Sequence, residues 1–197
     1  YSTPAGKNTI VIVLADHGDG MGSHRMVTKQ VSFYEEMTNV PFIIAGPGIH
    51  PRQKPVEDLL TQPTIDLLPT LCELAGIPVP SSKPGISLAP FLKGEKQKRQ
   101  HPYAASEWHS EYEVTVSPGR MIRSPRYKYT HYLEGNGEEL YDMLKDKGER
   151  RNLAHDPKYS KILAEHRALL DDYIRRTQDD YRSLKVEADK RWRSHAP

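Results

Sequence analysis

The sequence predicts the α/β fold class, divided into two parts of different pattern by the stretch 94–102. Two apolar runs, Thr9–Ala15 and Val40–Ala45, do not alternate with polar residues, which is typical of strands covered on both faces in a parallel sheet. A helical pattern follows at Asp66–Ala75. Beyond the dividing stretch come short strand candidates and one long amphipathic pattern, which indicate a second, smaller part.

The helix predicted at Asp66–Ala75 has signals at both ends. Asp66 is a candidate N-cap, which puts Pro69 in the first turn, where a missing N–H costs little. Gly76 suits the left-handed position that follows many helices. Cys72 lies inside this helix and is the only cysteine, so no intramolecular disulfide can form.

The stretch 94–102 is charged and poor in apolar residues, which indicates an exposed linker. We therefore expect two domains, 1–95 and 96–197. Strand candidates follow the linker at Tyr103–Trp108, Met121–Arg123 and Tyr127–Leu133. Ser124-Pro125-Arg126 has turn chemistry, so the last two should form a hairpin.

A long helix is predicted after the strands, because apolar and aromatic side chains recur at three- and four-residue steps. The stripe comprises Ile162, Leu163, His166, Leu169, Leu170, Tyr173, Ile174, Thr177 and Tyr181. Residues 185–197 are polar, so we expect that end to fray.

Composition excludes several classes of function. The 197 residues carry a formal net charge of +2, too small for a general attraction to nucleic acid or membrane surfaces. No apolar stretch approaches the roughly 20 residues needed to span a bilayer. We therefore expect neither a nucleic-acid partner nor a membrane span. Self-association is possible through the exposed edge of the half-sheet.

Chemically useful side chains gather where the first apolar run ends. The sixteen residues from Leu14 to Lys29 contain two carboxylates, two imidazoles, three glycines and a lysine. A cation-assisted anion site needs such groups, and open α/β sheets place ligands at strand ends. The candidates are Asp16, His17, His24 and Lys29.

Several motifs together resemble the second half of a sulfatase of the alkaline phosphatase superfamily. They are Asp16-His17-Gly18, Lys29, Phe33-Tyr34-Glu35-Glu36, Val40–Ile44, Thr64–Pro78, Glu138–Asp142 and Arg151–Ala154. The resemblance runs from Thr9 to about residue 177, most of the chain. It implies the C-terminal part of an alkaline-phosphatase-like α/β/α sandwich, followed by a small antiparallel sheet packed with a C-terminal helix.

The first half of that family's pattern is absent. Its nucleophile is a formylglycine made from the first residue of Cys-x-Pro-x-Arg or Ser-x-Pro-x-Arg, and neither motif occurs here. Cys72 has helical surroundings instead. We therefore expect the nucleophile upstream of this chain, and we expect the chain to be inactive alone.

The resemblance also implies roles for the candidates. Asp16 and His17 match ligands of a divalent cation, usually calcium, although His17 can alternatively hydrogen-bond a sulfate oxygen or the nucleophile. Lys29 matches the lysine that contacts the sulfate and stabilises the leaving oxygen. His24 is either a general acid or a ligand of a sugar hydroxyl. The structural alternatives are a turn aspartate, a backbone-bonded histidine, a surface lysine and a loop histidine.

Neighbouring residues are weaker candidates. Glu35 and Glu36 are adjacent carboxylates that should point in different directions, and family context suggests a structural role for one. Trp108, His109 and Arg120 have the chemistry to contact sulfated sugars, although packing explains Trp108 better.

Two other kinds of binding loop are not supported by the sequence. The glycines after the first strand do not match a dinucleotide fingerprint, because the third glycine position is Ser23. The spacing of an EF-hand loop is also absent. A phosphatase or phosphonate hydrolase of the same superfamily stays open, as does a non-catalytic glycan-binding or structural module. The preferred substrate is a carbohydrate sulfate, and the resemblance suggests a periplasmic or secreted enzyme.

Overall fold

The computed structural model describes residues 2–27, 32–56, 59–82, 84–95, 101–108, 117–133 and 137–183. The chain forms two compact units: a first unit of Tyr1–Lys29 and Glu36–Ala104, and a second unit of Gln30–Glu35 and Ala105–Pro197. The predicted assignment of catalytic and C-terminal domains to either side of residue 95 stays a prediction.

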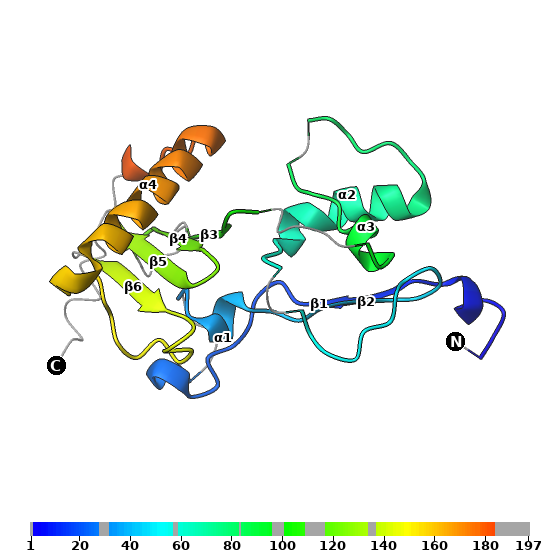
Figure 1. The fold of residues 1–197 in the computed structure, drawn as a ribbon, viewed down its shortest axis with the longest axis horizontal. Helices are drawn as coiled ribbons and strands as arrows, with labels where there is room; N and C mark the ends of the chain where they lie inside the picture. The colour runs from blue at the N-terminus through cyan, green and yellow to red at the C-terminus, as the bar shows by residue number, and fades with distance from the viewer. Residues whose placement is uncertain are drawn as a thin grey trace, which may run out of the picture. The chain divides into compact units, whose positions relative to one another are not determined.

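Figure 1 shows the order of the helices and strands along the chain. In order they are β1 (Val11–Leu14), α1 (Glu35–Thr38), β2 (Phe42–Ala45), α2 (Pro63–Ala75), α3 (Ala89–Leu92), β3 (Ala104–Trp108), β4 (Gly119–Arg123), β5 (Tyr127–Tyr132), β6 (Glu138–Asp142) and α4 (Ser160–Thr177). None of the helices in the described ranges is long and apolar enough to cross a membrane.

β1 and β2 form a two-stranded antiparallel ribbon, in which Val11 lies opposite Ala45 and Leu14 opposite Phe42. The expectation of a parallel, doubly covered strand is therefore wrong for the described part of the chain. Val13 and Ile43 are 49% and 56% exposed. An uninterrupted apolar run shows that both faces of a strand are apolar, but the strand beside it decides the direction of pairing.

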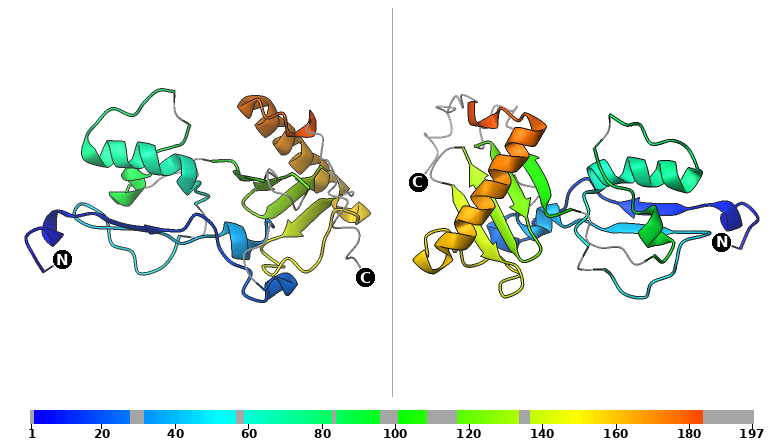
Figure 2. Two further views of the ribbon diagram at one scale, coloured as in Figure 1. Left: turned by 180° about the vertical axis from the view of Figure 1, so that it is seen from behind. Right: turned by 45° about the horizontal axis from the view of Figure 1, so that its top comes forward.

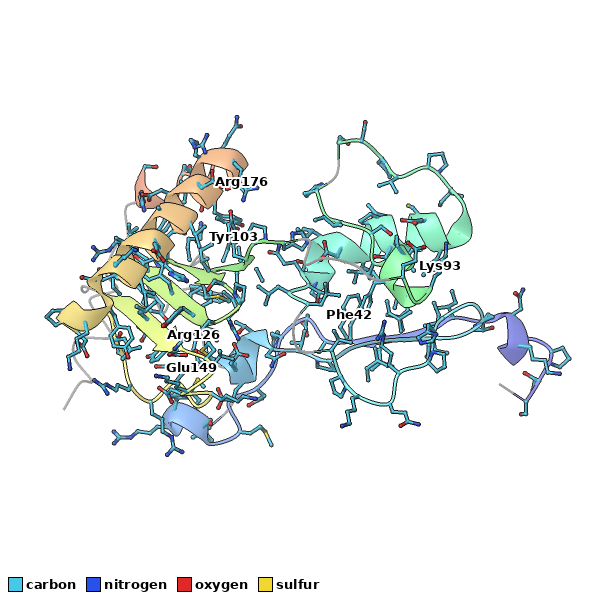
Figure 3. The ribbon with its side chains drawn as sticks, viewed as in Figure 1. Phe42, Lys93, Tyr103, Arg126, Glu149 and Arg176 are labelled. Carbon is cyan, nitrogen blue, oxygen red and sulfur yellow. The ribbon has the colours of Figure 1, made fainter. Side chains whose placement is uncertain are left out.

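α2 lies to one side of the ribbon in all three views (Figures 1 and 2). The side chain of Phe42, labelled in Figure 3, is half-buried. The predicted self-association through an exposed sheet edge stays a prediction.

The start of α2 corrects the N-cap prediction. The helix begins at Pro63 with Gln62 as its N-cap, so Asp66 lies in the first turn and Pro69 lies inside the helix. Because Pro69 has no N–H for the carbonyl of Ile65, that carbonyl is open to close approach, and Gly85 packs against it. Gly76 ends the helix in the left-handed region, with φ 69°, as predicted.

Asp66 is fully buried, and its carboxylate joins separate segments of the first unit. It accepts hydrogen bonds from the backbone N–H of Gln62 at 2.8 Å and of Ile86 at 2.9 Å. The ring of His101 contacts the same carboxylate at 2.9 Å. These partners compensate the cost of burying a carboxylate, so Asp66 has a structural role.

The second unit contains a four-stranded sheet with the order β3-β4-β5-β6, in which β5 pairs antiparallel with both β4 and β6. The predicted hairpin is confirmed, since Arg123 of β4 lies opposite Lys128 of β5. α4 lies against one face of this sheet (Figure 2). Its buried residues, Leu163, His166 and Leu170, come from the predicted stripe, although the helix ends at Thr177.

The alternation along β5 divides its side chains between the two faces of the sheet. Tyr127 and His131 lie on the face of α4, where Tyr127 packs edge-on against the ring of His166. Tyr129 is buried on the same face and donates a hydrogen bond to Glu138. The opposite face carries Lys128, Thr130 and Tyr132.

Lys128 is 1% exposed and lies at the centre of a buried ion cluster. Its Nζ atom lies 2.7 Å from Glu35 Oε1 and 2.9 Å from Glu149 Oε1, and it donates to the carbonyl of Phe33. Glu149, labelled in Figure 3, also accepts the backbone N–H of Glu35 at 2.6 Å. Burial raises the pKa of the Glu149 carboxyl, although Lys128 opposes this. The cluster fixes the chain just before α1 to the sheet.

Replacing Lys128 by methionine should destabilise the protein by about 3–5 kcal/mol, because two carboxylates then lose their shared buried partner. Urea unfolding measures this change. The matched control is Lys147→Met at an exposed lysine, which should shift the free energy of unfolding by less than about 0.5 kcal/mol. Equal effects of the two variants would contradict the cluster.

Glu138 predicts a pH dependence of stability. Its hydrogen bonds with Arg167, and then with Tyr129, lower the pKa of its carboxyl to about 2. The unfolded chain binds the proton at higher pH, so this stabilisation is complete above the unfolded pKa and is lost as pH falls towards the folded one. The difference in unfolding free energy between the wild type and Glu138→Gln should shrink between about pH 6 and about pH 3. A constant difference across that range would contradict the assignment.

Candidate functional site

Asp16 and His17 lie directly after β1, at the strand end that the sequence predicted for ligand-binding groups. The Asp16 side chain is 88% exposed, and its Oδ2 atom lies 3.6 Å from Nε2 of His17. Oδ1 of Asp16 accepts the backbone N–H of His17 at 3.0 Å. The two candidate metal ligands therefore lie side by side at the surface of the first unit.

The other ring nitrogen of His17 fixes its tautomer. Nδ1 lies 2.7 Å from the carbonyl oxygen of Gly18, and a carbonyl only accepts, so Nδ1 carries the proton of the neutral ring. Nε2 then holds a lone pair beside the Asp16 carboxylate. A metal-binding histidine commonly has this arrangement, so the two side chains fit a shared cation.

The fit is partial. Calcium takes six to eight oxygen ligands, whereas this turn supplies one carboxylate and one imidazole. In the part of the chain that the structure describes, no group of three or more His, Cys, Asp or Glu side chains is arranged to hold a metal ion. Any further ligands must come from elsewhere.

His24 lies in a 3-10 turn, Ser23–Arg25, that has unusual backbone geometry. His24 has φ 48° and Arg25 has φ 63°, both in the left-handed region that side chains other than glycine rarely adopt. Gly22 precedes them with φ 94°, a backbone angle that glycine adopts without steric cost because it has no Cβ. Strain of this kind is enriched at functional sites.

α1 contacts both of these turns within the first unit. The backbone N–H of Gly18 donates to the carbonyl of Met37 at 2.9 Å. Ser23 Oγ donates to Glu36 Oε1 at 2.5 Å, and Glu36 Oε2 lies 4.0 Å from Nε2 of His24. Residues of α1 therefore contact both the turn that carries Asp16 and His17 and the turn that carries His24.

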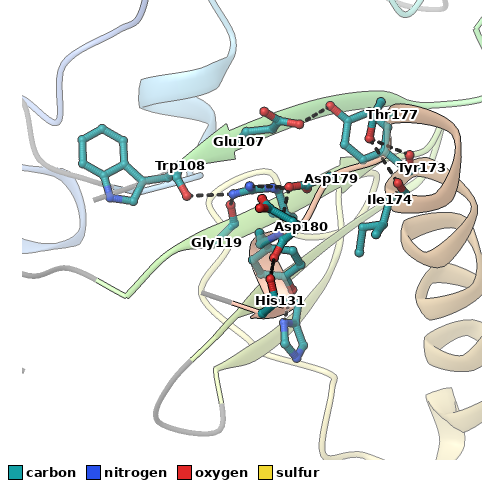
Figure 4. Close-up of polar contacts among 12 residues, drawn as sticks. Glu107, Trp108, Gly119, His131, Tyr173, Ile174, Thr177, Asp179 and Asp180 are labelled. Carbon is teal, nitrogen blue, oxygen red and sulfur yellow. Dashed lines mark hydrogen bonds and ion pairs between the residues drawn. The ribbon is translucent and has the colours of Figure 1, made fainter. Parts of the chain in front are cut away.

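Lys29 lies outside the described residues, and so does His109, so their predicted roles stay predictions. The suggestion that Arg120 contacts substrate is wrong. Arg120 is 4% exposed, and its guanidinium binds both carboxylate oxygens of Asp179 and the carbonyls of Trp108 and Gly119 (Figure 4). Its position on β4 places it in the packing of the second unit, where its donors are used.

Glu36 is the residue that sequence reasoning undervalued. The divergence of Glu35 and Glu36 was predicted and is confirmed, because Glu35 contacts Lys128 while Glu36 contacts Ser23. The contact of Glu36 with His24 joins residues twelve positions apart in the sequence, and no periodic pattern signals it. Only its place in the Tyr-Glu-Glu run drew attention to it.

Gly18→Ala should destabilise the first unit, because the new Cβ would lie 1.8 Å from the carbonyl oxygen of Glu36. The expected loss is about 1–3 kcal/mol, measured by thermal or urea unfolding. Gly148→Ala is the control, since its Cβ would meet nothing closer than 3.5 Å. Neither glycine has a positive φ, so the comparison isolates the steric contact. Equal stability of the two variants would contradict it.

Comparison with known proteins places this chain in a family. The family model for the C-terminal part of N-sulphoglucosamine sulphohydrolase matches residues 22–176. The chain is 77% identical over its whole length to a Delta 4,5-hexuronate-2-O-sulfatase of Bacteroides thetaiotaomicron, and it spans 41% of that protein.

Solved structures agree with this assignment. A structure described as a 2-O GAG sulfatase has 77% identity and a TM-score of 0.94, with 100% of this chain and 42% of that chain covered. A phosphonate monoester hydrolase from Silicibacter pomeroyi has 25% identity and a TM-score of 0.75, with 93% and 39% covered. The mixed α/β architecture, with antiparallel sheets and a C-terminal helix, matches the sulfatase structure. The chain belongs to the sulfatases, in the family of the N-sulphoglucosamine sulphohydrolase C-terminal region.

Proposed function

We propose that this chain is part of a sulfuric ester hydrolase that acts on a sulfated carbohydrate. The observation that carries the proposal is the pairing of Asp16 with His17 at a strand end, beside a strained turn that holds His24. The relative named a Delta 4,5-hexuronate-2-O-sulfatase, at 77% identity, supports a uronic acid sulfate as the substrate class. We also propose that the enzyme works in the periplasm or outside the cell.

In this proposal Asp16 and His17 hold a calcium ion together with ligands from other polypeptide. When bound, the ion supplies positive charge that polarises the sulfate oxygens. The exposed carboxylate of Asp16 gives the oxygen ligand that calcium prefers, and Nε2 of His17, 3.6 Å away, gives a nitrogen ligand.

Lys29 and His24 act on the sulfate ester in this proposal. The ammonium of Lys29 contacts the sulfate and stabilises the negative charge that develops on the leaving oxygen. His24 either protonates that oxygen or binds a hydroxyl of the sugar. The nucleophile, a formylglycine in the family pattern, is supplied by residues outside this chain, so the chain alone should be inactive.

A phosphoryl-transfer enzyme is the main rival, because a phosphonate monoester hydrolase shares this architecture. Cation-and-lysine sites stabilise either tetrahedral anion, so the described residues do not discriminate between sulfate and phosphonate. A glycan-binding or structural module without catalysis is the third reading. The three differ in which reaction, if any, accompanies binding.

A substrate comparison distinguishes the three readings. The full-length gene product, activated by a formylglycine-generating enzyme, should hydrolyse an aryl sulfate and a 2-O-sulfated unsaturated uronide far faster than an aryl phosphate or phosphonate. The present chain alone should hydrolyse none of them. Faster phosphonate than sulfate hydrolysis would reject the sulfatase proposal, and glycan binding without turnover would favour the non-catalytic module.

Two substitutions test the assigned roles in the full-length enzyme. Asp16→Ala should weaken calcium binding measured by calorimetry, because the cation loses a carboxylate. Lys29→Ala should lower kcat by about 10²–10³-fold, because charge on the leaving oxygen is no longer stabilised, while the circular dichroism spectrum is unchanged. Lys54→Ala, at an exposed lysine of the first unit, is the control. An unaltered kcat in Lys29→Ala would remove that residue from the mechanism.

A further inference from the structure

The turn that carries His24 is held in a strained backbone conformation. Met21, His24 and Arg25 have φ values of 46°, 48° and 63°, so three residues other than glycine adopt the left-handed region within five positions. Such a conformation persists only where neighbouring contacts impose it. The contacts of this turn therefore decide where the imidazole lies.

The carboxylate of Glu36 spans the turn. Its Oε1 atom accepts the hydroxyl of Ser23 at 2.5 Å, and its Oε2 atom faces Nε2 of His24 at 4.0 Å. The side chains of His24 and Glu36 are 17% and 30% exposed, so this interaction is shielded from much of the solvent. One oxygen anchors the turn and the other faces the ring.

The backbone of α1 fixes Glu36 in turn. The carbonyl of Met37 accepts the N–H of Gly18, and the carbonyl of Glu36 packs so closely on Gly18 that no Cβ fits there. Glu36 is thus attached directly to the turn that carries Asp16 and His17. The carboxylate of Glu36 also accepts the hydroxyl of Ser23, so the same residue contacts the turn that carries His24.

We propose that Glu36 is a positioning residue that orients His24 towards the substrate. The proposal rests on the proposed function, in which His24 contacts the sulfate ester or its sugar. The 4.0 Å between Nε2 of His24 and Oε2 of Glu36 is an ion-pair distance and not a hydrogen bond, so the carboxylate acts on the ring through its charge. A third group that orients a catalytic imidazole is a recurring arrangement in enzymes.

A double-mutant cycle in the activated full-length enzyme tests this inference. His24→Ala and Glu36→Ala should each lower kcat/KM for the sulfated substrate by at least about tenfold. The double variant should lie within about threefold of His24→Ala, because Glu36 acts through that ring. Glu36→Gln should recover part of the loss, since it keeps an acceptor for the Ser23 hydroxyl. Glu73→Ala, at an exposed glutamate of α2, should match the wild type.

Separate values of kcat and KM show which role His24 has, and both Glu36 variants should change the same parameter as His24→Ala. Additive losses in the double variant, or a wild-type kcat/KM in Glu36→Ala, would overturn the inference. If the wild type does not hydrolyse sulfates, or His24→Ala retains full activity, the proposed function fails instead.

A spectroscopic measurement on the present chain does not depend on activity. The ring nitrogen NMR signals of His24 should move in Glu36→Gln and in Ser23→Ala, and should stay in place in Glu73→Ala. Unmoved signals in Glu36→Gln would overturn the inference even if the sulfatase proposal holds.

Discussion

The contact between α1 and the turn after β1 is the constraint on which the candidate site depends. Gly18 donates its N–H to Met37, and its missing side chain leaves space for the carbonyl of Glu36. This contact adds to the hydrogen bonds that Asp16 and His17 make within their own turn. Backbone-to-backbone support restricts the position of a turn more than long, rotatable side chains can. The site is therefore built on a short helix and on the glycine that lets it approach.

A helix of four residues is not stable alone, because ordering the backbone of its first turn costs more free energy than the single hydrogen bond of that turn contributes. In the second unit, the residue that begins α1 is fixed by the buried ion cluster of Lys128, Glu35 and Glu149. In the first unit, Glu36 and Met37 contact the two turns. Adjacent carboxylates thus have separate tasks, since one satisfies a buried lysine and the other faces an imidazole. A buried lysine requires such partners, because its charge has lost the solvation of water.

A cationic side chain can likewise serve packing although its chemistry suits an anion. Arg120 has the planar, bidentate chemistry that suits sulfate, yet it binds Asp179 and stacks over the ring of Tyr181. A guanidinium whose donors are satisfied by its own chain stabilises packing and does not recruit an anion. The predicted anion contacts are left to the segment after β1, where the Asp16 carboxylate is exposed and can accept a cation.

The sequence by itself determined most elements and the residue types of the site. Apolar runs located β1 and β2, turn residues located the β4–β5 hairpin, and the stripe of α4 was recognisable because its period is local. Only the tertiary structure decided that β1 and β2 pair antiparallel, that Asp66 joins separate segments, that Arg120 is buried and that Glu36 faces His24. These outcomes depend on contacts between residues distant in sequence, which periodicity and capping signals do not record.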